Sequence, residues 1–327
     1  MNNAAPEPDA LKSAQARYAR RAAEACGYAF RSLDGGDGYL FEVRDEQRVT
    51  TFAAGAGTPY ALNDARGASI ARDKAFCAEV LRQAGVPVLP GQVFFVTKRW
   101  ADMRSPGREL EDARAYAAAA TFPLFCKPLS ASNGLYAEVI ESVEAFDDYI
   151  SRVATEHFAI LVQPYVSAPE HRVFVLNGRA LFSYRKLSPQ VIGDGRRTLS
   201  ELIDSVPREA EAPALKARGR DARGHLLSPT DVPHEDDAIT LEGPANRATG
   251  GGANGVRDGA PAPMARLAIG AAQAVGLSLA AVDLFDLGED LAVIEVNSNP
   301  MIATLEDAGR WDLIIEIWRA NFDAALR

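Results

Sequence analysis

The sequence reads Val282-Asp283-Leu284-Phe285-Asp286-Leu287-Gly288-Glu289-Asp290-Leu291-Ala292-Val293-Ile294-Glu295-Val296-Asn297-Ser298-Asn299-Pro300 in the stretch that decides the fold. Two apolar runs flank a Gly-Glu-Asp turn, and this pattern predicts a β-hairpin. With a three-residue loop at 288–290, Asp283 lies opposite Glu295, and Asn297 shares their face because strand side chains alternate. The other face is predicted to meet the core, and it consists of Val282, Leu284, Ala292, Ile294 and Val296.

Two carboxylates and an amide oxygen therefore converge on the polar face of a hairpin that is otherwise apolar. Hard oxygen ligands grouped in this way suit Mg²⁺, which proteins commonly share with substrate phosphates. A solvated hairpin face is the alternative, and it is the more common outcome for an isolated hairpin. The motifs upstream favour the metal site.

Length, charge and cysteine usage set broad limits on the protein class. With 327 residues, the chain can bury a large core and is expected to divide into two or three lobes. The net charge of −9 argues against a nucleic-acid or anionic membrane partner. Three cysteines without metal or redox spacing are typical of a reducing cytosol. Residues 1–10 lack an apolar targeting segment and no run could span a bilayer, so we expect a cytoplasmic protein.

Local patterns predict a leader followed by alternating helices and strands. The leader is expected to have a helix at 11–26 and strands at 28–31, 39–44 and 49–54. Beyond it we expect helices at 64–84, 109–120, 143–154, 264–275 and 311–326 and strands at 93–96, 122–128, 136–140, 159–166 and 239–241. Asn177-Gly178 predicts a hairpin of 172–176 with 180–184, Thr198 to Glu201 a capping box, and 246–258 a glycine-rich loop.

Five passages, taken in order, resemble the ATP-grasp core of cyanophycin synthetases and bifunctional glutathione synthetases, with D-alanine–D-alanine ligases more distant. The passages are Ala71-Arg72-Asp73-Lys74 with Ala84-Gly85-Val86-Pro87; Phe122-Pro123-Leu124-Phe125-Cys126-Lys127-Pro128; residues 162–173, VQPYVSAPEHRV; Val191-Ile192-Gly193-Asp194-Gly195 with Thr198; and Ala245-Asn246-Arg247-Ala248-Thr249-Gly250-Gly251 before the hairpin. They cover about residues 58–305, and the first 57 residues carry no match.

This resemblance implies an α/β (α+β) protein with the ATP-grasp fold, in which two α+β lobes clasp ATP behind a short N-terminal α/β leader. The implied domains are a leader at 1–65, a central lid domain at 66–166 and a C-terminal domain with the magnesium site at 167–327. The implied cofactors are ATP and Mg²⁺, and Mn²⁺ can substitute.

The resemblance also assigns roles in nucleotide binding. It places Lys74 and Lys127 on the phosphates, where a compact point charge is well suited. A structural ion pair is the alternative for Lys127, which lies on an apolar strand. Residues 163–166, with Gln163, Tyr165 and Val166, match the hinge that contacts adenine. Three further residues have assigned positions: Glu170 at the ribose hydroxyls, Lys186 near phosphate, and Gly134 in the lid loop.

Asp283, Glu295 and Asn297 match the magnesium ligands of this family, in agreement with the hairpin argument. Arg172, Arg185 and Arg247 are candidates for binding the substrate carboxylate or an acyl phosphate, since Arg binds both bidentately. The loop 249–255 could present backbone N–H groups to an anion, or it could be a flexible connector. Of these, Arg172, Lys186 and Arg247 are predicted to act in catalysis.

Three positions depart from the family pattern. Gln163 stands where relatives usually carry Glu, although Gln can still accept and donate hydrogen bonds. The lid loop 129–136 keeps only Gly134 where a glycine-rich loop is usual, so closure over phosphates is expected to be weaker or different. Ala281 replaces an Arg of the D-alanine ligases, which disfavours that activity.

The favoured function is ATP-dependent amide-bond formation between a carboxylate and an amine, through an acyl phosphate, with release of ADP and phosphate. Amino acids or small peptides are the expected substrates, and the short leader favours a stand-alone ligase. Because related folds are often dimeric, a homodimer is the expected assembly. One alternative is a regulatory or degenerate nucleotide-binding protein without turnover. Another keeps the chemistry but phosphorylates a hydroxyl or joins an acid to a thiol.

Overall fold

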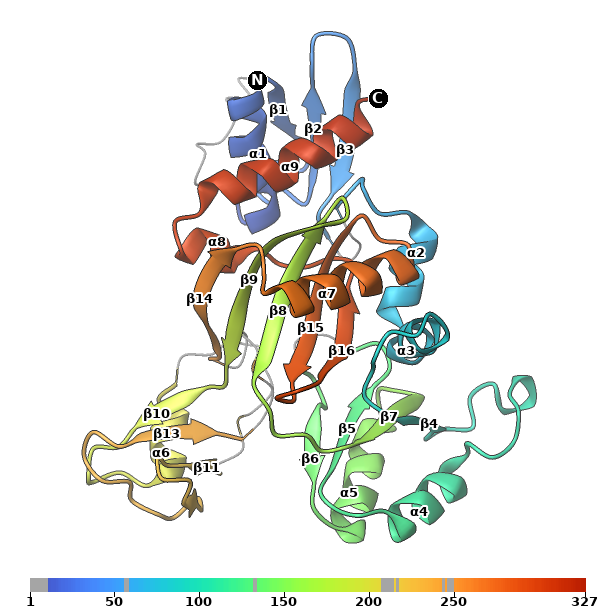
Figure 1. Ribbon diagram of the computed structural model, residues 1–327, viewed down its shortest axis with the longest axis vertical. Coiled ribbons are helices and arrows are strands. Elements are labelled where there is room, and N and C mark those ends of the chain that lie inside the picture. The colour runs from blue at the N-terminus through green and yellow to red at the C-terminus, as the bar shows by residue number, and fades with distance from the viewer. Residues whose placement is uncertain are drawn as a thin grey trace.

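The structure is a computed structural model that describes residues 11–55, 59–131, 134–206, 215, 218–242, 245 and 250–327. Figure 1 shows an elongated molecule with a small unit at one end, a five-stranded sheet in the middle, and two four-stranded sheets at the other end. Every strand pairing within these sheets of the described residues is antiparallel. The α/β class expected from the sequence is confirmed.

The unit at the top of Figure 1 joins the two ends of the described chain. Helix α1 (Ala14–Cys26) begins at the cap Ser13 and ends at Gly27, which adopts a left-handed conformation. A three-stranded sheet follows, made of β1 (Ala29–Ser32), β2 (Leu40–Arg44) and β3 (Val49–Ala53). The last helix, α9 (Trp311–Ala325), returns to pack beside α1.

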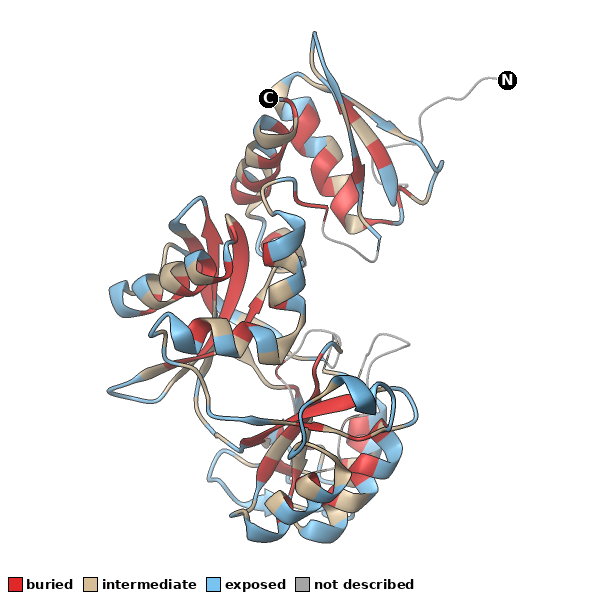
Figure 2. Cartoon of the chain, turned by 90° about the vertical axis from the view of Figure 1, so that its right-hand side faces the viewer, coloured by how far each residue is buried: buried red, intermediate tan, exposed pale blue. Residues whose placement is uncertain are grey.

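Aromatic side chains hold this unit together. Trp318 of α9 contacts Phe41 and Phe52 of the sheet at centroid distances of 5.9 and 5.8 Å. Such edge-on contacts add to the large apolar area that each ring buries. Figure 2 shows the buried residues along the inner sides of both helices and the sheet. The leader elements predicted at 11–54 are confirmed, whereas the packing of helix 311–326 on them could not be read from the sequence.

The middle sheet has the order β14-β9-β8-β15-β16. Its strands are β8 (Glu170–Leu176), β9 (Arg179–Leu187), β14 (Gly252–Asp258), β15 (Leu279–Asp286) and β16 (Leu291–Asn297). Asn177 and Gly178 both have positive φ, as the predicted hairpin turn between β8 and β9 requires. The prediction of a loop across 246–258 is wrong for 252–258, because these residues form β14 at the sheet edge. Residues 246–249 lie outside the described residues.

Opposite faces of the middle sheet meet different neighbours. Helix α7 (Ala262–Val275) covers one face together with α2 (Ala65–Arg72) and α3 (Lys74–Gln83). The other face packs against the N-terminal unit and α8 (Ala303–Asp307), but only over the half of the strands nearest to it. The remaining half of that face carries charged side chains.

A single helix was predicted at 64–84, and this prediction is wrong at one point. Asp73 leaves the helical conformation and its carboxylate accepts hydrogen bonds from the backbone N–H groups of Ala75 and Phe76, at 2.9 and 3.0 Å. It therefore caps a second helix, because a carboxylate at this position satisfies the unpaired N–H groups of the first turn. The break makes Lys74 the first residue of α3.

The lid lobe (residues 92–164) is a four-stranded sheet with two helices on one face. Its strands are β4 (Gln92–Phe95), β7 (Ala159–Pro164), β5 (Leu124–Pro128) and β6 (Glu138–Ile140), in that order. Helices α4 (Leu110–Ala119) and α5 (Val143–Val153) pack on Leu124 and Cys126, so Phe125 and Lys127 point to the opposite face. The Ser142 cap of α5 is confirmed.

A smaller sheet lies beside the lid lobe in Figure 1. It has the order β10-β13-β11-β12, from β10 (Gln190–Ile192), β13 (Ala238–Leu241), β11 (Gly219–Arg220) and β12 (Leu226–Leu227). Helix α6 (Leu199–Asp204) begins with the predicted capping box of Thr198 and Glu201. Arg218 reaches Glu141 of the lid lobe at 2.5 Å, which ties the two together.

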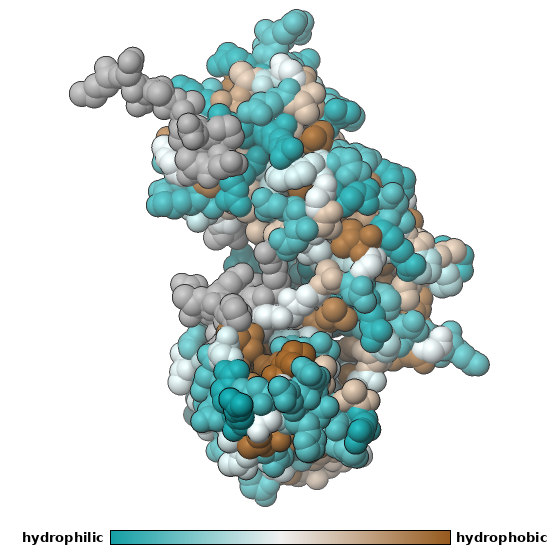
Figure 3. Space-filling view, turned by 90° about the vertical axis from the view of Figure 1, so that its left-hand side faces the viewer, coloured by the Kyte–Doolittle hydropathy of each residue, from teal (hydrophilic) through white to brown (hydrophobic). Residues whose placement is uncertain are grey.

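The face of the molecule seen in Figure 3 is largely hydrophilic, with small, separate apolar patches. Within the described ranges, no helix combines the length and apolar character that a membrane crossing needs. The division into domains at 1–65, 66–166 and 167–327 stays a prediction.

Candidate active site

The hairpin of β15 and β16 places Asp283 directly opposite Glu295, as predicted. The predicted loop at 288–290 is wrong, since the last pair is Asp286 with Leu291 and the loop is 287–290. Leu284 then pairs with Val293, but Asp283 pairs with Glu295, because a β-bulge lies between these two pairs. The bulge restores the predicted pairing of Asp283. Bulges insert one extra residue into a strand and re-aim its side chain.

The bulge changes which side chains of β16 meet the core. Val293 and Val296 both belong to the core beneath α7, whereas Ile294 is only half-buried and lines a small cavity beside Glu295. The prediction that Ile294 lies on the core face is therefore wrong. A sequence pattern of strict alternation cannot reveal the extra residue.

On one face of the middle sheet, the side chains are apolar near the N-terminal unit and charged farther from it. On β8, Phe174 packs toward the N-terminal unit and Arg172 lies two residues farther on. On β15, Ala281 and Asp283 follow the same order. The register pairs Arg172 with Asp283 across the two strands, so a base and an acid meet at the edge of the apolar packing.

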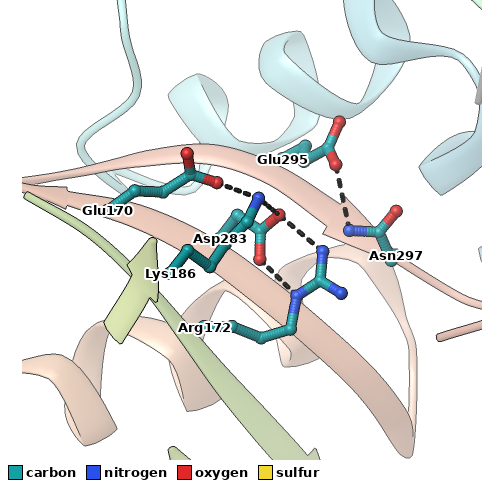
Figure 4. Close-up of polar contacts among 6 residues, drawn as sticks. All are labelled: Glu170, Arg172, Lys186, Asp283, Glu295 and Asn297. Carbon is teal, nitrogen blue, oxygen red and sulfur yellow. Dashed lines mark hydrogen bonds and ion pairs between the residues drawn. The ribbon is translucent and has the colours of Figure 1, made fainter. Parts of the chain in front are cut away.

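Figure 4 shows the cluster that results. The Arg172 guanidinium donates two hydrogen bonds to Asp283, from Nε to Oδ1 at 2.6 Å and from Nη2 to Oδ2 at 2.7 Å. Lys186 on β9 lies between Asp283, at 3.3 Å, and Glu170, with which it forms an ion pair. Asn297 donates from Nδ2 to Glu295 Oε1 at 3.2 Å.

Burial and charge act against each other on these groups. Burial raises the pKa of Asp283, but Arg172 and Lys186 outweigh it and hold the pKa below 3.8. Burial also raises the pKa of Glu170 above 4.5, although Lys186 opposes the change. The pKa of Lys186 lies above 10.5 because Asp283 and Glu170 outweigh the effect of burial. Asp283 is thus ionised at neutral pH and has cationic neighbours.

Lys74 and Lys127 approach the same region from α3 and from the lid lobe. Lys127 is 5% exposed, and burial lowers its pKa below 10.5 against the opposing charge of Glu295. Burial raises the pKa of Glu295, but Lys74 and then Lys127 help to bring it below 4.5. Lys74 Nζ donates to the backbone oxygen of Ala131 in the lid loop at 2.8 Å. Two cations and one carboxylate therefore converge between the lobes.

A narrow cavity lies between these lobes and has Gln163 in its wall, together with Lys74 and Glu295. Gln163 is 4% exposed and donates from Nε2 to the backbone oxygen of Pro90 at 3.3 Å. Its Oε1 atom has no hydrogen-bond partner within the described residues. A buried acceptor left unpaired costs free energy, so its position favours a ligand that donates an N–H group there.

Other predicted residues are placed less centrally. Tyr165 and Val166 follow β7 and are not part of the cavity wall, and Tyr165 is exposed. Gly134 has positive φ at the end of the lid loop, a conformation that glycine adopts readily. Arg185 is exposed on β9, and Arg247 lies outside the described residues.

Sequence reasoning missed several residues that shape this cavity. Cys77 and Leu81 enter it from α3, and Val88 and Leu89 enter it from the segment that follows. Gly91 lies so close to Gln163 Cγ that an added Cβ atom would sit 2.9 Å from it. The glycine is therefore needed for this close approach. The Ala84-Gly85-Val86-Pro87 motif marked the neighbourhood, but only the fold brings Val88 beside Val293.

The donor set partly fits a divalent cation. In the part of the chain described, no group of three or more His, Cys, Asp or Glu side chains is arranged to hold a metal ion. Asp283 and Glu295 are cross-strand neighbours and both have lowered pKa values, which suits a cation that draws its other ligands from phosphates and water. Both oxygens of Asp283 are engaged by Arg172, so a cation would have to compete with that pair.

Comparisons with known proteins agree with this geometry. A model of the RimK-like ATP-grasp domain matches residues 258–320, which include the hairpin. The chain is 26% identical over 260 residues to the glutathione biosynthesis bifunctional protein GshAB of Streptococcus thermophilus, covering 72% of this chain and 31% of that protein. It is 27% identical over 255 residues to the cyanophycin synthetase of Trichormus variabilis, covering 72% of this chain and 27% of that protein.

The solved structure of a bifunctional glutathione synthetase from Pasteurella multocida aligns with a TM-score of 0.51 at 21% identity, covering 92% of this chain and 44% of that one. The chain thus spans less than a third of the length of the two relatives above. The resemblance inferred from the motifs is confirmed: residues 258–320 match the RimK-like ATP-grasp domain, the chain is similar in sequence to these synthetases, and its fold is that of the ATP-grasp ligases.

Proposed function

We propose that this protein is an ATP-dependent ligase that joins a carboxylate to an amine and releases ADP and phosphate. The observation that carries the proposal is the meeting of Lys74, Lys127 and Gln163 with Glu295 between the lobes, beside the Asp283 cluster. The site therefore combines lysines that can bind phosphate, a hydrogen-bond acceptor for a nucleobase, and carboxylates that can bind a metal ion. Relatives named for glutathione and cyanophycin synthesis support amino acids or small peptides as substrates.

In the proposed reaction, an oxygen of the substrate carboxylate attacks the γ-phosphorus of ATP, and the bond to ADP breaks. The amine nitrogen of the second substrate then attacks the acyl carbon, phosphate leaves with the C–O electron pair, and the amine proton passes to solvent. Phosphoryl transfer depends chiefly on positioning and charge stabilisation. Mg²⁺, which Asp283, Glu295 and Asn297 would hold, supplies charge neutralisation at the phosphates when bound.

The side chains of this chain contribute in distinct ways. Lys74 and Lys127 bring positive charge to the phosphates, and Lys127 gains a partner that offsets its burial. Gln163 Oε1 accepts a hydrogen bond from the exocyclic amino group of adenine. Lys186 and Arg172 stand next to Asp283, where they can orient the transferred phosphoryl group and the substrate carboxylate. Arg247 is assigned to the same task from the sequence.

The test is to incubate the protein with Mg·ATP and amino acids, singly and in pairs, and to measure ADP, phosphate and product masses. A pair-dependent release of ADP, with a product mass equal to the sum of both substrates minus water, is expected. Lys127→Met should abolish this release, whereas Lys12→Met, at a lysine whose side chain is 74% exposed in the N-terminal unit, should leave it unchanged. A product that is phosphorylated, or joined through sulfur, would contradict amide formation.

The adenine contact has its own test. Gln163→Met removes the acceptor, and we expect ATP to bind about tenfold more weakly, which corresponds to one hydrogen bond. Inorganic tripolyphosphate, which lacks the base, should bind both forms equally. An equal loss for both ligands would mean that Gln163 acts on the phosphates or on the fold.

A second candidate is a nucleotide-binding protein without ligase turnover. The lid stretch 129–136 favours it, since Gly134 is its only glycine. In that case ATP binds, and no substrate pool accelerates its hydrolysis. The cytoplasmic location and the homodimer remain predictions.

A further inference from the structure

A second cavity opens at the edge of the lid lobe, where the segment between β4 and α4 projects sideways in Figure 1. Its volume is about 390 Å³, and its wall is made of Phe95, Arg99, Trp100, Met103, Arg104 and Phe158. It shares no lining residue with the narrow cavity that contains Lys74 and Gln163. The second cavity is therefore a separate place on the molecule, and ligase chemistry does not account for it.

Aromatic rings form much of this wall. Phe95 and Phe158 lie nearly parallel at 6.2 Å, with an interplanar angle of 18°, and Trp100 meets Phe158 edge-on at 5.4 Å. Trp100 is 52% exposed and has a positive φ of 59°, which is uncommon for a bulky residue and costs backbone energy. Exposed aromatic side chains held in this way offer flat apolar surfaces to a flat partner.

Arg104 gives the cavity a specific polar group. Its side chain is only 5% exposed and its guanidinium lies over the Phe95 ring at 4.2 Å. Nη2 donates to the backbone oxygen of Thr97 at 2.7 Å and lies 3.4 Å from Glu109. Nε and Nη1 are buried and have no hydrogen-bond partner among the described residues. Buried donors of a charged group are costly to leave unpaired, so these two call for an acceptor.

The charge of the residues around the cavity indicates that this acceptor belongs to an anion. Residues 97–109 contain the bases Lys98, Arg99, Arg104 and Arg108 against the acids Asp102 and Glu109, in a chain of net charge −9. Arg99 lies over Trp100 at 4.0 Å, at the rim of the cavity. Nε–H and Nη1–H lie on different edges of the guanidinium, so each can donate to a single acceptor oxygen, and the positive charge favours an anionic acceptor such as a carboxylate. The ligand is thus expected to be an anion.

We propose that this cavity binds a small aromatic carboxylate. The ring of the ligand lies among Phe95, Trp100 and Phe158, and its carboxylate accepts a hydrogen bond from one of the two unpartnered donors of Arg104, Nε or Nη1. Met103 is 83% exposed, so its unbranched side chain is free to move aside and close over the ring. The volume is at the lower end of the range for small-molecule pockets, which suits one ring and its acid group.

Tryptophan fluorescence can test the proposal on the whole protein with phenylacetate as the probe. The chain has three tryptophans, and the other two, Trp311 and Trp318, belong to the N-terminal unit. Phenylacetate should change the emission saturably, and Mg·ATP should not compete. Phenylacetamide, which is neutral and of the same shape, should bind at least about tenfold more weakly, the effect of losing a charged hydrogen-bonded pair.

Substitutions in and outside the cavity test whether phenylacetate binds there. Arg104→Met should abolish binding, whereas Arg114→Met, at an exposed ion pair on α4, should leave it unchanged. Trp100→Phe should remove the fluorescence response but retain binding by calorimetry. Equal binding of phenylacetate and phenylacetamide overturns the proposal, and this comparison does not depend on whether Arg104→Met folds. Binding only to peptides that end in phenylalanine, or an unchanged response in Trp100→Phe, would overturn it too.

Discussion

At the scale of single residues, Arg172 is the group whose role the fold defines best. It keeps 19% of its side-chain surface, while Asp283 keeps only 1%. The pair is thus bidentate and largely withdrawn from water. Removing one partner of a buried pair leaves an uncompensated charge, which is far costlier than losing a surface pair.

We therefore expect Arg172→Met to lower the free energy of unfolding by about 3 kcal/mol. Arg114→Met breaks a surface pair with Asp147 whose two side chains are 44% and 46% exposed, and it should cost less than about 1 kcal/mol. Urea denaturation of both variants provides the comparison. Equal losses would show that Lys186 alone suffices to hold Asp283.

At the scale of elements, the bulge in β16 directs the neighbouring side chains Val293 and Ile294 to different environments. Val293 is 2% exposed and packs under α7, and Ile294 lines the narrow cavity that also contains Lys74 and Gln163. Val293→Ala should reduce the free energy of unfolding by about 2 kcal/mol through lost methyl groups and the space left behind. Ile294→Ala should cost less stability and should weaken ATP binding more. Urea denaturation and nucleotide titration separate the two effects, and the reverse order would contradict the observed register.

Local signals predicted those elements whose cause is itself local. The Asn177-Gly178 turn, the Ser142 cap and the Thr198 capping box depend on residues within four positions of one another, so the sequence was sufficient for them. The pairing of Asp283 with Glu295 was also predictable, because a short hairpin limits the register.

Other elements depend on contacts between distant segments. The strand β14 exists because β9 offers it an edge, so its glycine-rich sequence indicated a loop instead. The pairing of Arg172 with Asp283 joins strands more than one hundred residues apart, and sequence alternation cannot supply that register. For this reason Arg172 was predicted as a substrate ligand without its partner. The aromatic pocket at Arg104 was missed because it brings Phe158 beside 95–104.

At the scale of the whole molecule, the three cysteines lie in three separate parts of the fold and differ in burial. Cys26 is partly exposed at the end of α1, Cys77 is buried in α3, and Cys126 is buried in the lid lobe. Burial raises the pKa of Cys77 to about 11 and that of Cys126 to about 12. Only the thiolate is the nucleophile, so at pH 8 a thiol reagent should label Cys26 rapidly and the other two only after denaturation.

The same two thiols predict how stability depends on pH. An unfolded thiol ionises near pH 9, whereas Cys77 and Cys126 stay protonated in the folded protein until about pH 11 and 12. Their contribution is therefore fully present below pH 9 and is lost as the pH rises toward 12, because ionisation favours the unfolded chain. The buried tyrosines Tyr60 and Tyr149, whose pKa values burial also raises, add to the loss above about pH 10. Urea denaturation between pH 7 and 10 should show this decline, and the Cys77→Ala, Cys126→Ala double variant should flatten it relative to Cys26→Ala. An unchanged slope in the double variant would mean that both thiols ionise equally well in the folded protein, which their burial does not allow.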